Sequence, residues 1–358
     1  MSVKKNKLKI FHALFTDNVG GLEQSYIDYC KALIMCGHDV TCLVLPNAPY
    51  IDKLKELSFN IITQRVHGFY DVFAWCSLKK LFNKHKPDIV LAHNGRAIFT
   101  CRMALTGNDT PLIGVSHSNT VRYSKKASAL ITLTEDMRRH FVKNKYPEDR
   151  CVVMNNMIDL SGKKNIQNYC INTPLTIGFL GRLSPEKGAD QIVNATSILK
   201  KKNYDIKTII AGDGEEKLKL QSMANKLAVS DDIEFQGWVY QDEKAEFFNK
   251  IDILCVPSYN ETFGIVVLEA WAHGVLVIAS EVDGLAAIIS DNINGILYPR
   301  GDYNNLAETI EKILLDNGKI AEKIVMEGSK KVDDFGIKKS SGKLDNILFA
   351  LKDKIDSK

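Results

Sequence analysis

The feature that most constrains this 358-residue chain is the regular pairing of a short apolar run with a helical segment. The runs are rich in Val, Ile and Leu and do not alternate with polar residues. Strands that are apolar on both faces lie in parallel sheets covered by helices on each side, so the sequence predicts an α/β fold. In the first half the expected strands are residues 9–15, 39–45, 59–63, 88–93, 112–116, 129–133 and 151–155.

The pattern occurs twice, on either side of a polar and aperiodic segment, residues 160–174. At about 150 residues per domain, the length also fits two domains. We expect two doubly wound, Rossmann-like domains that face a cleft, residues 1–165 and 166–335, followed by a C-terminal helix at 336–358. The strands of the second half are predicted at 175–181, 205–212, 232–237, 252–257, 274–280 and 294–299. Helices are predicted near 22–36, 72–85, 134–143, 187–202, 215–227, 242–249 and 264–273, and from 303 to 352.

Composition is that of a globular protein, with 45% apolar and 25% charged residues. The basic N-terminus lacks a small-residue cleavage site, and Glu269, His273 and Gly274 interrupt the longest apolar stretch. We therefore expect a cytoplasmic or peripheral protein. The eight cysteines form no C-x-x-C pair, which favours free, mostly buried thiols over a zinc framework.

Ligands of doubly wound sheets bind beyond the carboxyl ends of the strands, so residues that follow strands are the first candidates. Gly181 and Arg182 end one predicted strand, and Lys187 follows them at the start of a helix. A glycine allows close approach of a ligand, and two cations beside a helix N-terminus suit a diphosphate. A surface loop with ordinary charges is the alternative.

A second candidate lies after the strand at 252–257, where Glu261 occupies a loop. The sequence predicts that residues 262–264 open the next helix, with backbone N–H groups available to phosphate or sugar hydroxyls. Glu269 lies inside this helix among apolar residues and needs a partner. The two hydroxyls of a ribose or a core salt bridge would both serve.

The first half offers Gly20 and Gly21, which follow the first strand and open a helix. They do not form G-x-G-x-x-G, so a dinucleotide fingerprint is absent, and this weighs against a nicotinamide oxidoreductase. His117, and with lower rank His93, end strands, where a hydrogen-bonding or acid–base role competes with simple burial. No D-x-D occurs, which favours cations of the chain over a metal for neutralising a diphosphate.

Together these residues resemble the retaining glycosyltransferases of family 4, which have the GT-B fold. The resemblance spans almost the whole chain and is strongest over residues 177–299. Its matching segments, in order, are IGFLGRLSPEKGADQIVNA, IIAGDGEEKLKLQSMAN, IEFQGWV, FFNKIDILCVPSYNETFGIVVLEAWAHGVLVIAS and INGILYP. It also implies that the C-terminal helix packs back on the N-terminal domain.

The resemblance implies site roles residue by residue. Arg182 and Lys187 would neutralise the donor diphosphate, and Glu269 would bind the nucleotide ribose. Glu261 and His117 would act at the reacting centre, with His117 on the acceptor side. The donor-binding set is Gly20, Gly21, Arg182, Lys187, Gly212, Trp238, Val239, Thr262, Phe263, Gly264, Ile265 and Glu269.

The function expected is metal-independent, cofactor-free and retaining transfer of a hexose-type sugar from a nucleoside-diphosphate sugar, with UDP favoured. The acceptor would be a glycan or a lipid-linked glycan of the bacterial envelope, and no nucleic acid partner is expected. A non-catalytic sugar-nucleotide-binding protein and a GT-B epimerase are the alternatives. Two basic groups in the first half suggest contact with the anionic inner face of the plasma membrane: Lys79, Lys80, Lys84 and Lys86, and Arg138, Arg139, Lys143 and Lys145.

Overall fold

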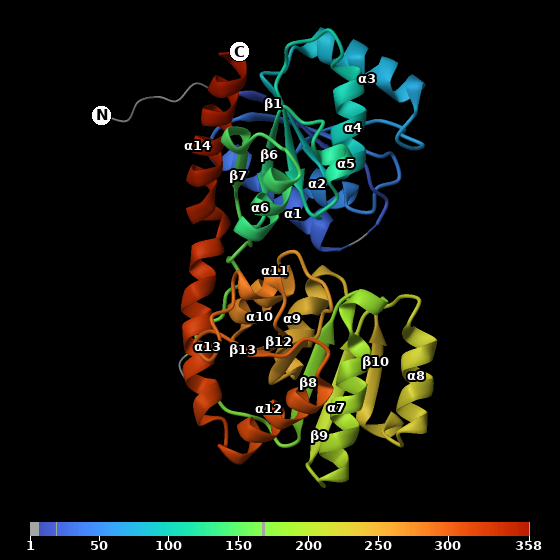
Figure 1. The fold of residues 1–358 in the computed structure, drawn as a ribbon, viewed down its shortest axis with the longest axis vertical. Helices are drawn as coiled ribbons and strands as arrows, with labels where there is room; N and C mark the ends of the chain where they lie inside the picture. The colour runs from blue at the N-terminus through green and yellow to red at the C-terminus, as the bar shows by residue number, and fades with distance from the viewer. Residues whose placement is uncertain (1–6, 19, 167–168, 358) are drawn as a thin grey trace, which may run out of the picture. The chain divides into compact units, whose positions relative to one another are not determined.

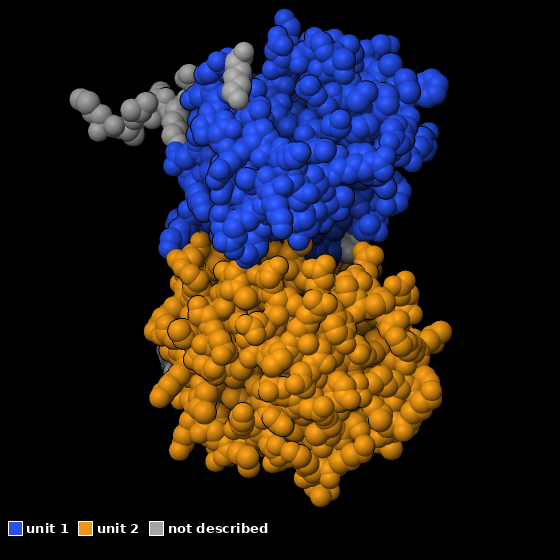
Figure 2. Space-filling view, in the orientation of Figure 1, with its two compact units in different colours: residues 1–159, 336–358 blue, residues 160–335 orange. Residues whose placement is uncertain are grey.

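The computed structural model describes residues 7–18, 20–166 and 169–357. The chain forms two compact units, coloured separately in Figure 2. Unit 1 comprises residues 1–159 and 336–358, and unit 2 comprises residues 160–335. Each unit has its own parallel sheet and its own hydrophobic core.

Unit 1 has a seven-stranded sheet in the order β3-β2-β1-β4-β5-β6-β7, and every neighbouring pair is parallel. The inner strands are buried along nearly their whole length, as their continuous apolar runs predict. The strands are β1 (Lys9–Leu14), β2 (Asp39–Val44), β3 (Asn60–Thr63), β4 (Ile89–His93), β5 (Leu112–Ser116), β6 (Ala129–Thr132) and β7 (Cys151–Val153).

Helices cover both faces of the unit 1 sheet (Figure 1). The β1–β2 and β4–β5 connections run in opposite directions along the sheet, and right-handed crossovers then place α1 and α4 on opposite faces. Helix α14 packs beside α1, and α3 packs beside α4. The helices are α1 (Gly21–Met35), α2 (Ile51–Glu56), α3 (Val72–His85), α4 (Asn94–Ala104), α5 (Val121–Ser124), α6 (Glu135–Lys143) and α14 (Ile337–Asp356).

Although α14 ends the chain, it belongs to the core of unit 1. Leu344, Leu348 and Leu351 are buried there with the residues of the sheet. His38 accepts a hydrogen bond at Nδ1 from the Leu8 backbone N–H, so its Nε2–H donates to Asp345 of α14 at 3.1 Å. The last helix is therefore fixed to unit 1 by both apolar and polar contacts.

Unit 2 has a six-stranded parallel sheet in the order β10-β9-β8-β11-β12-β13. Helices α7, α8 and α12 cover one face, and α9, α10 and α13 cover the other. The strands are β8 (Leu175–Leu180), β9 (Ile206–Ala211), β10 (Ile233–Gly237), β11 (Ile253–Val256), β12 (Leu276–Ser280) and β13 (Ile296–Tyr298). The helices are α7 (Ala189–Lys201), α8 (Lys217–Lys226), α9 (Gln241–Lys250), α10 (Ile265–His273), α11 (Asp283–Ala286), α12 (Tyr303–Leu315) and α13 (Lys319–Lys331).

The predicted fold class is confirmed, and every predicted strand is present with ends within two residues of those expected. The described part of the polar segment 160–174 contains no helix or strand. It is nevertheless attached to unit 2, because buried Asp252 accepts hydrogen bonds from the backbone N–H of Asn172 and of Thr176.

The two strand orders locate the point in each unit where a ligand is expected. In unit 1 the crossovers diverge between β1 and β4, and in unit 2 they diverge between β8 and β11. Loops that leave such neighbouring strands on opposite faces open a crevice at their carboxyl ends. The residues that follow β1, β4, β8 and β11 are therefore the candidates for a site.

Candidate functional site

Two loops meet at the switch point of unit 2, one after β8 and one after β11. The backbone N–H of Tyr259 in the second loop donates to the carbonyl of Glu186 in the first at 2.8 Å. Gly188 allows this approach, because its φ is 66° and a Cβ built on it would lie 2.2 Å from the Pro257 carbonyl oxygen. The glycine therefore sets how closely the two loops can pack.

The same loops bring together two of the predicted site residues. Lys187, in a single 3-10 turn before α7, donates from Nζ to Oε2 of Glu261 at 2.6 Å. The other oxygen of Glu261 accepts the backbone N–H of Thr262 at 3.1 Å. The Glu261 side chain is only 13% exposed and that of Lys187 is 30% exposed, so the pair is partly shielded from water. The ion pair therefore holds the Lys187 ammonium group in place near the end of β8.

Helix α10 begins at Ile265, one residue after the start of the helix predicted near 264–273 and three residues after Thr262, where the sequence predicts that it opens. Thr262, Phe263 and Gly264 precede it, and Gly264 is its N-cap with a left-handed φ of 88°. Thr262 directs its N–H to Glu261 and not outward, and the buried Phe263 ring packs against Phe335 with centroids 6.0 Å apart. The prediction that residues 262–264 form the first turn was therefore wrong, and Ile265 is the first helical residue.

Gly284 packs closely against the backbone of this loop at Glu261 and Thr262. A Cβ built on it would lie 2.2 Å from the Glu261 carbonyl oxygen and 2.5 Å from the Thr262 carbonyl carbon. Gly284 lies in α11, which follows the next strand of the sheet. The position of Glu261 thus depends on a glycine that sequence reasoning did not select.

Glu269 lies on α10, as predicted, and its partner in the structure is a lysine. Lys244 of α9 donates from Nζ to Oε1 of Glu269 at 2.6 Å, and the two side chains are 31% and 14% exposed. Helices α9 and α10 pack side by side, which brings these residues together. A core salt bridge was one of the two interactions expected for this acid. The contact with Lys244 involves Oε1 and not Oε2 of Glu269.

The predicted base-binding residues also lie at strand ends of unit 2. The Gly212 N–H, after β9, donates to the Gly237 carbonyl at the end of β10 at 2.6 Å. Trp238 and Val239 follow directly, with Val239 buried and Trp238 half-buried. Arg182 is exposed two residues beyond β8. These residues lie at the same carboxyl edge as the Lys187–Glu261 pair.

In unit 1 the predicted residues also lie at the carboxyl edge. Gly20 is the N-cap of α1 and Gly21 is its first residue, so the glycine pair opens a helix as expected. His117 follows β5, and His93 ends β4. The Nδ1 atom of His93 and the Nε2 atom of His117 are 2.9 Å apart, within hydrogen-bonding distance.

Burial governs the charge of these histidines. It lowers the pKa of His117 to about 4. It also lowers the pKa of His93 well below its usual value, with the neighbouring His12 and His117 adding to the effect. Both rings are therefore neutral at neutral pH, and their contact joins one donor nitrogen to one acceptor nitrogen.

Two family models cover these units. The model described as glycosyltransferase family 4 matches residues 19–161, and the model described as glycosyl transferases group 1 matches residues 163–331. The chain belongs to glycosyltransferase family 4. It is a glycosyltransferase, and its two parallel-sheet units have the GT-B fold.

Solved structures and curated relatives agree with this assignment. The structure of Anabaena Alr3699/HepE in complex with UDP and glucose matches the glycosyltransferase with a TM-score of 0.83 and 19% identity, over 96% of this chain and 100% of that one. The lipopolysaccharide core biosynthesis glycosyltransferase LpsE of Rhizobium meliloti is 24% identical over 87% of this chain and 90% of its own length. A D-inositol 3-phosphate glycosyltransferase of Stackebrandtia nassauensis is 34% identical over 40% of this chain and 34% of its own length.

Helices α3 and α6 carry most of the basic residues that are expected to contact membranes, but their large apolar side chains lie mostly in the core. Leu78, Phe82 and Phe141 of α3 and α6 are buried in the glycosyltransferase. In the second basic group, Arg138 pairs with Glu135 and Glu148, and Arg139 pairs with Asp136. Near the first basic group, three large apolar side chains are exposed just before and at the start of α3: Tyr70, Val72 and Phe73. Within residues 7–18, 20–166 and 169–357, no helix is long and apolar enough to span a membrane.

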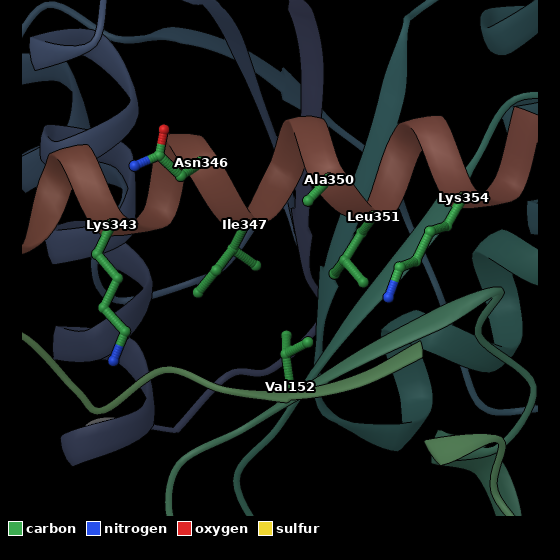
Figure 3. A pocket seen from close by; sticks show the side chains of 7 residues that line it. All are labelled: Val152, Lys343, Asn346, Ile347, Ala350, Leu351 and Lys354. Atoms are coloured by element: carbon green, nitrogen blue, oxygen red, sulfur yellow. The ribbon is translucent and has the colours of Figure 1, made fainter. Parts of the chain in front are cut away.

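A pocket of about 420 Å³ lies where α14 of the glycosyltransferase crosses the edge strand β7. Ile347 and Leu351 point toward Val152, with Lys343 and Lys354 at the two ends (Figure 3). No predicted site residue lines this pocket. It is therefore distinct from the residues at the strand ends.

Proposed function

We propose that the enzyme is a retaining, metal-independent glycosyltransferase that uses a UDP-sugar with a hexose-type sugar. The observation that carries this proposal is the Lys187–Glu261 pair at the switch point of unit 2, with Arg182 on the same loop. Fixed cations at the end of β8 suit a leaving diphosphate. The HepE complexes with UDP and with UDP-glucose support uracil as the base.

The donor would be held by unit 2. Lys187 and Arg182 would neutralise the diphosphate, and Glu269 would bind the ribose hydroxyls while Lys244 holds its Oε1. The uracil would lie beside Gly212 and the residues that follow β10, Trp238 and Val239. The amides of Phe263, Gly264 and Ile265 would contact the sugar and phosphate, and Gly20 and Gly21 of unit 1 would border the diphosphate.

The chemistry follows from where charge develops. When the bond between the anomeric carbon and the diphosphate oxygen breaks, the electron pair leaves with the diphosphate and positive charge builds on the sugar ring. Lys187 would stabilise the leaving group, and Glu261, which accepts a hydrogen bond from Lys187, would lie beside the developing positive charge. His117 would contact the transferred sugar on the acceptor side. We assign no protein nucleophile.

The acceptor is proposed to be a glycan or a lipid-linked glycan of the bacterial envelope. The similarity to LpsE, which is named for lipopolysaccharide core biosynthesis, supports this class.

We also propose peripheral contact with anionic lipid through the exposed Lys79 and Lys80 and the apolar residues at the start of α3. Pelleting with phosphatidylglycerol vesicles at low salt, and its loss in Phe73→Ser or Lys79→Glu, would support the contact. Equal pelleting with neutral vesicles would contradict it.

The test of the enzymatic proposal is release of nucleoside diphosphate from a panel of UDP-, GDP- and ADP-sugars in the presence of a glycan or lipid-linked glycan acceptor, with and without EDTA. We expect turnover with a UDP-sugar that survives EDTA, and a product whose anomeric proton coupling in NMR matches that of the donor. Loss of turnover in EDTA would contradict metal independence. An inverted product would contradict retention.

The Glu261→Gln variant tests the placement of the site. It keeps the side-chain shape but removes the charge, so turnover should fall by about 10²–10³ while UDP affinity stays within about threefold. Glu327→Gln, which alters an exposed ion pair with Lys330, is the matched control and should turn over normally. Wild-type turnover in Glu261→Gln would show that Glu261 is misplaced. Tight donor binding without any turnover in the wild type would indicate a non-catalytic binding protein.

A further inference from the structure

An aromatic cluster lies on one side of unit 1, apart from the residues assigned to the donor. Its rings come from the segment that leads into α3 and from α3, α4 and α5, and α4 lies next to both α3 and α5 (Figure 1). Phe99 of α4 is the centre, with the other four ring centroids 5.3 to 6.1 Å from its own. The members of the cluster are Phe69, Tyr70, Trp75, Phe99 and Tyr123.

The cluster lies at the surface of unit 1. Phe69, Trp75, Phe99 and Tyr123 are half-buried, and Tyr70 is 65% exposed. Large apolar groups that are exposed side by side are uncommon on a soluble protein, and they mark places where a ligand or partner binds. The exposed ring of Tyr70, supported by Phe99, therefore offers a flat surface to a ligand.

The segment that carries Tyr70 is held in one conformation. Asp71, the N-cap of α3, accepts the Ala74 backbone N–H at Oδ1 and the His67 backbone N–H at Oδ2, both at 3.0 Å. On the other side of Tyr70, the ring of Phe69 stacks on Tyr123 with centroids 4.0 Å apart. Binding to an aromatic surface that is already ordered costs little conformational entropy.

Positive charge lies beside the cluster. Arg122, Lys125 and Lys126, in α5 and directly after it, are exposed, and residues 119–126 contain no acid. None of the three cations forms a salt bridge with a described residue, in contrast to the paired arginines of α6. The guanidinium carbon of Arg122 lies 5.1 Å from the centroid of the Tyr123 ring. An anion bound here would meet cations that are not already neutralised.

This combination suits a charged sugar. The C–H groups on one side of a pyranose ring carry slight positive charge, and the face of an aromatic ring is negative, so the two stack. Arginine and lysine bind phosphate and carboxylate groups through charge-assisted hydrogen bonds. An aromatic surface without cations would fit a neutral glycan equally well, so the charge of α5 is what narrows the ligand class.

We propose that the aromatic cluster and the cations of α5 form an acceptor subsite for a negatively charged glycan. A sugar ring stacks on Tyr70, and a phosphate or carboxylate group of the same glycan pairs with Arg122. The assignment to the acceptor rests on the proposed function. It fits the position of α5, which lies on the connection that follows β5, as does His117.

This subsite is separate from the residues assigned to lipid contact. Phe73 is 90% exposed, and it has no ring contact with the described aromatic residues. We therefore expect Phe73→Ser to weaken vesicle pelleting and to leave glycan binding unchanged. Tyr70→Ala should do the opposite.

The test is binding of the labelled full-length protein to an array of neutral, phosphorylated and uronic-acid-containing oligosaccharides, followed by calorimetry on those that bind. We expect charged oligosaccharides to bind at least about tenfold more tightly than neutral ones, with a loss of about tenfold or more in Tyr70→Ala and Arg122→Ala. Tyr70→Phe keeps the ring and should stay within about threefold of the wild type. Comparing the phosphorylated and uronic-acid-containing oligosaccharides then shows which anion Arg122 binds.

Arg102→Ala is the matched control for charge, because Arg102 is exposed in the last turn of α4. It should bind the same oligosaccharides as the wild type. UDP affinity, which we assign to unit 2, should not change in any of these variants.

Failure of every charged oligosaccharide to bind, or equal binding of neutral and charged ones, would overturn the proposal. Wild-type affinity in Tyr70→Ala and Arg122→Ala would also overturn it. Reduced vesicle pelleting in Tyr70→Ala with unchanged glycan binding would assign Tyr70 to lipid instead. If charged oligosaccharides bind as expected but no UDP-sugar is turned over, the glycan site stands and the proposed transfer fails.

Discussion

Glu261 and Glu269 each accept a hydrogen bond from a lysine at 2.6 Å, so neither acid acts as an isolated charge. Exposed pairs of this kind contribute about 0–1 kcal/mol, and breaking a fully buried pair costs about 3–5 kcal/mol. These pairs are partly exposed and lie between those limits. A substitution of either lysine therefore changes both the charge of the site and the stability of unit 2, and the two effects have to be measured together.

The buried histidines make the stability of unit 1 depend on pH. Burial lowers the pKa of His12 to about 3, against about 6.5 in an unfolded chain. Between these values the unfolded state binds a proton that the folded state does not, so the free energy of unfolding falls as pH decreases. Between pH 7 and pH 5, the free energy of unfolding of His12→Asn should therefore fall by about 2 kcal/mol less than that of the wild type.

Urea unfolding of both proteins at the two pH values measures this difference, with fluorescence and circular dichroism as separate probes. An equal loss of stability in wild type and His12→Asn would contradict the protonation state assigned to the buried cluster.

Residue types and spacing predicted which side chains follow the strands, but not their partners. Lys187 and Glu261 are candidates because each follows an apolar run, and the fold brings them together. Lys244 could not be selected, because it is one of many lysines on polar helix faces and pairs with Glu269 only once α9 packs on α10. The contact of His93 with His117 joins two different strand ends, so the sequence alone does not reveal it.

At the scale of elements, the position of the donor loop depends on tight backbone contacts. Gly188 lets the β8 loop approach Pro257, and Gly284 lets α11 approach the carbonyl groups of Glu261 and Thr262. Both approaches are closer than a side chain would allow. The geometry of the loop is therefore set by neighbouring elements as well as by its own sequence.

Gly284→Ala tests this dependence. The new Cβ would meet backbone and not a flexible side chain, so the loop at Glu261 must shift. We expect unit 2 to lose about 1–3 kcal/mol of stability and turnover to fall about tenfold or more. Thermal unfolding and UDP release measure the two effects.

Gly342→Ala is the matched control, because Gly342 lies inside α14 with open space around it. It should stabilise unit 1 by about 0.5–1 kcal/mol and leave turnover unchanged. If Gly284→Ala were equally harmless, the loop would not depend on α11.

The sequence was most informative about strands and least informative about where helices begin. An apolar run long enough for a buried strand, bounded by polar residues, has few other interpretations. The sequence gives little indication of helix α4, because NGRAIFTCRMA mixes polar and apolar residues without a clear stripe. The sequence predicts that residues 262–264 open α10, up to three residues too early, because a left-handed Gly264 ends the loop and no side-chain pattern reveals that conformation.

At the scale of the whole molecule, the chain leaves unit 1 at residue 159 and returns to it at residue 336. The returning helix α14 supplies part of the unit 1 core and a buried hydrogen bond from His38 to Asp345. Folding of unit 1 therefore requires both ends of the chain. A polypeptide cut after residue 159 would expose the apolar surface that α14 covers.

Asp345→Ala tests whether the hydrogen bond to His38 helps to hold α14 on unit 1. It leaves a buried N–H of His38 without its acceptor and should destabilise unit 1 by about 1–3 kcal/mol in urea unfolding. Asp353→Ala, on the exposed side of the same helix, should change stability by less than about 0.5 kcal/mol. Similar stability of the two variants would show that the polar contact does not help to hold α14.

The division of roles between the units is the central claim: unit 2 binds a uridine nucleotide through Lys187 and Glu269. Isothermal titration of UDP, GDP and ADP into the wild type, Lys187→Ala and Glu269→Ala tests it directly, with thermal unfolding of each variant as a check on folding. We predict one UDP site in the wild type, weaker binding of GDP and ADP, and a loss of about tenfold or more in UDP affinity in both folded variants. UDP binding that is absent in the wild type, or equally tight in both variants, would contradict the account.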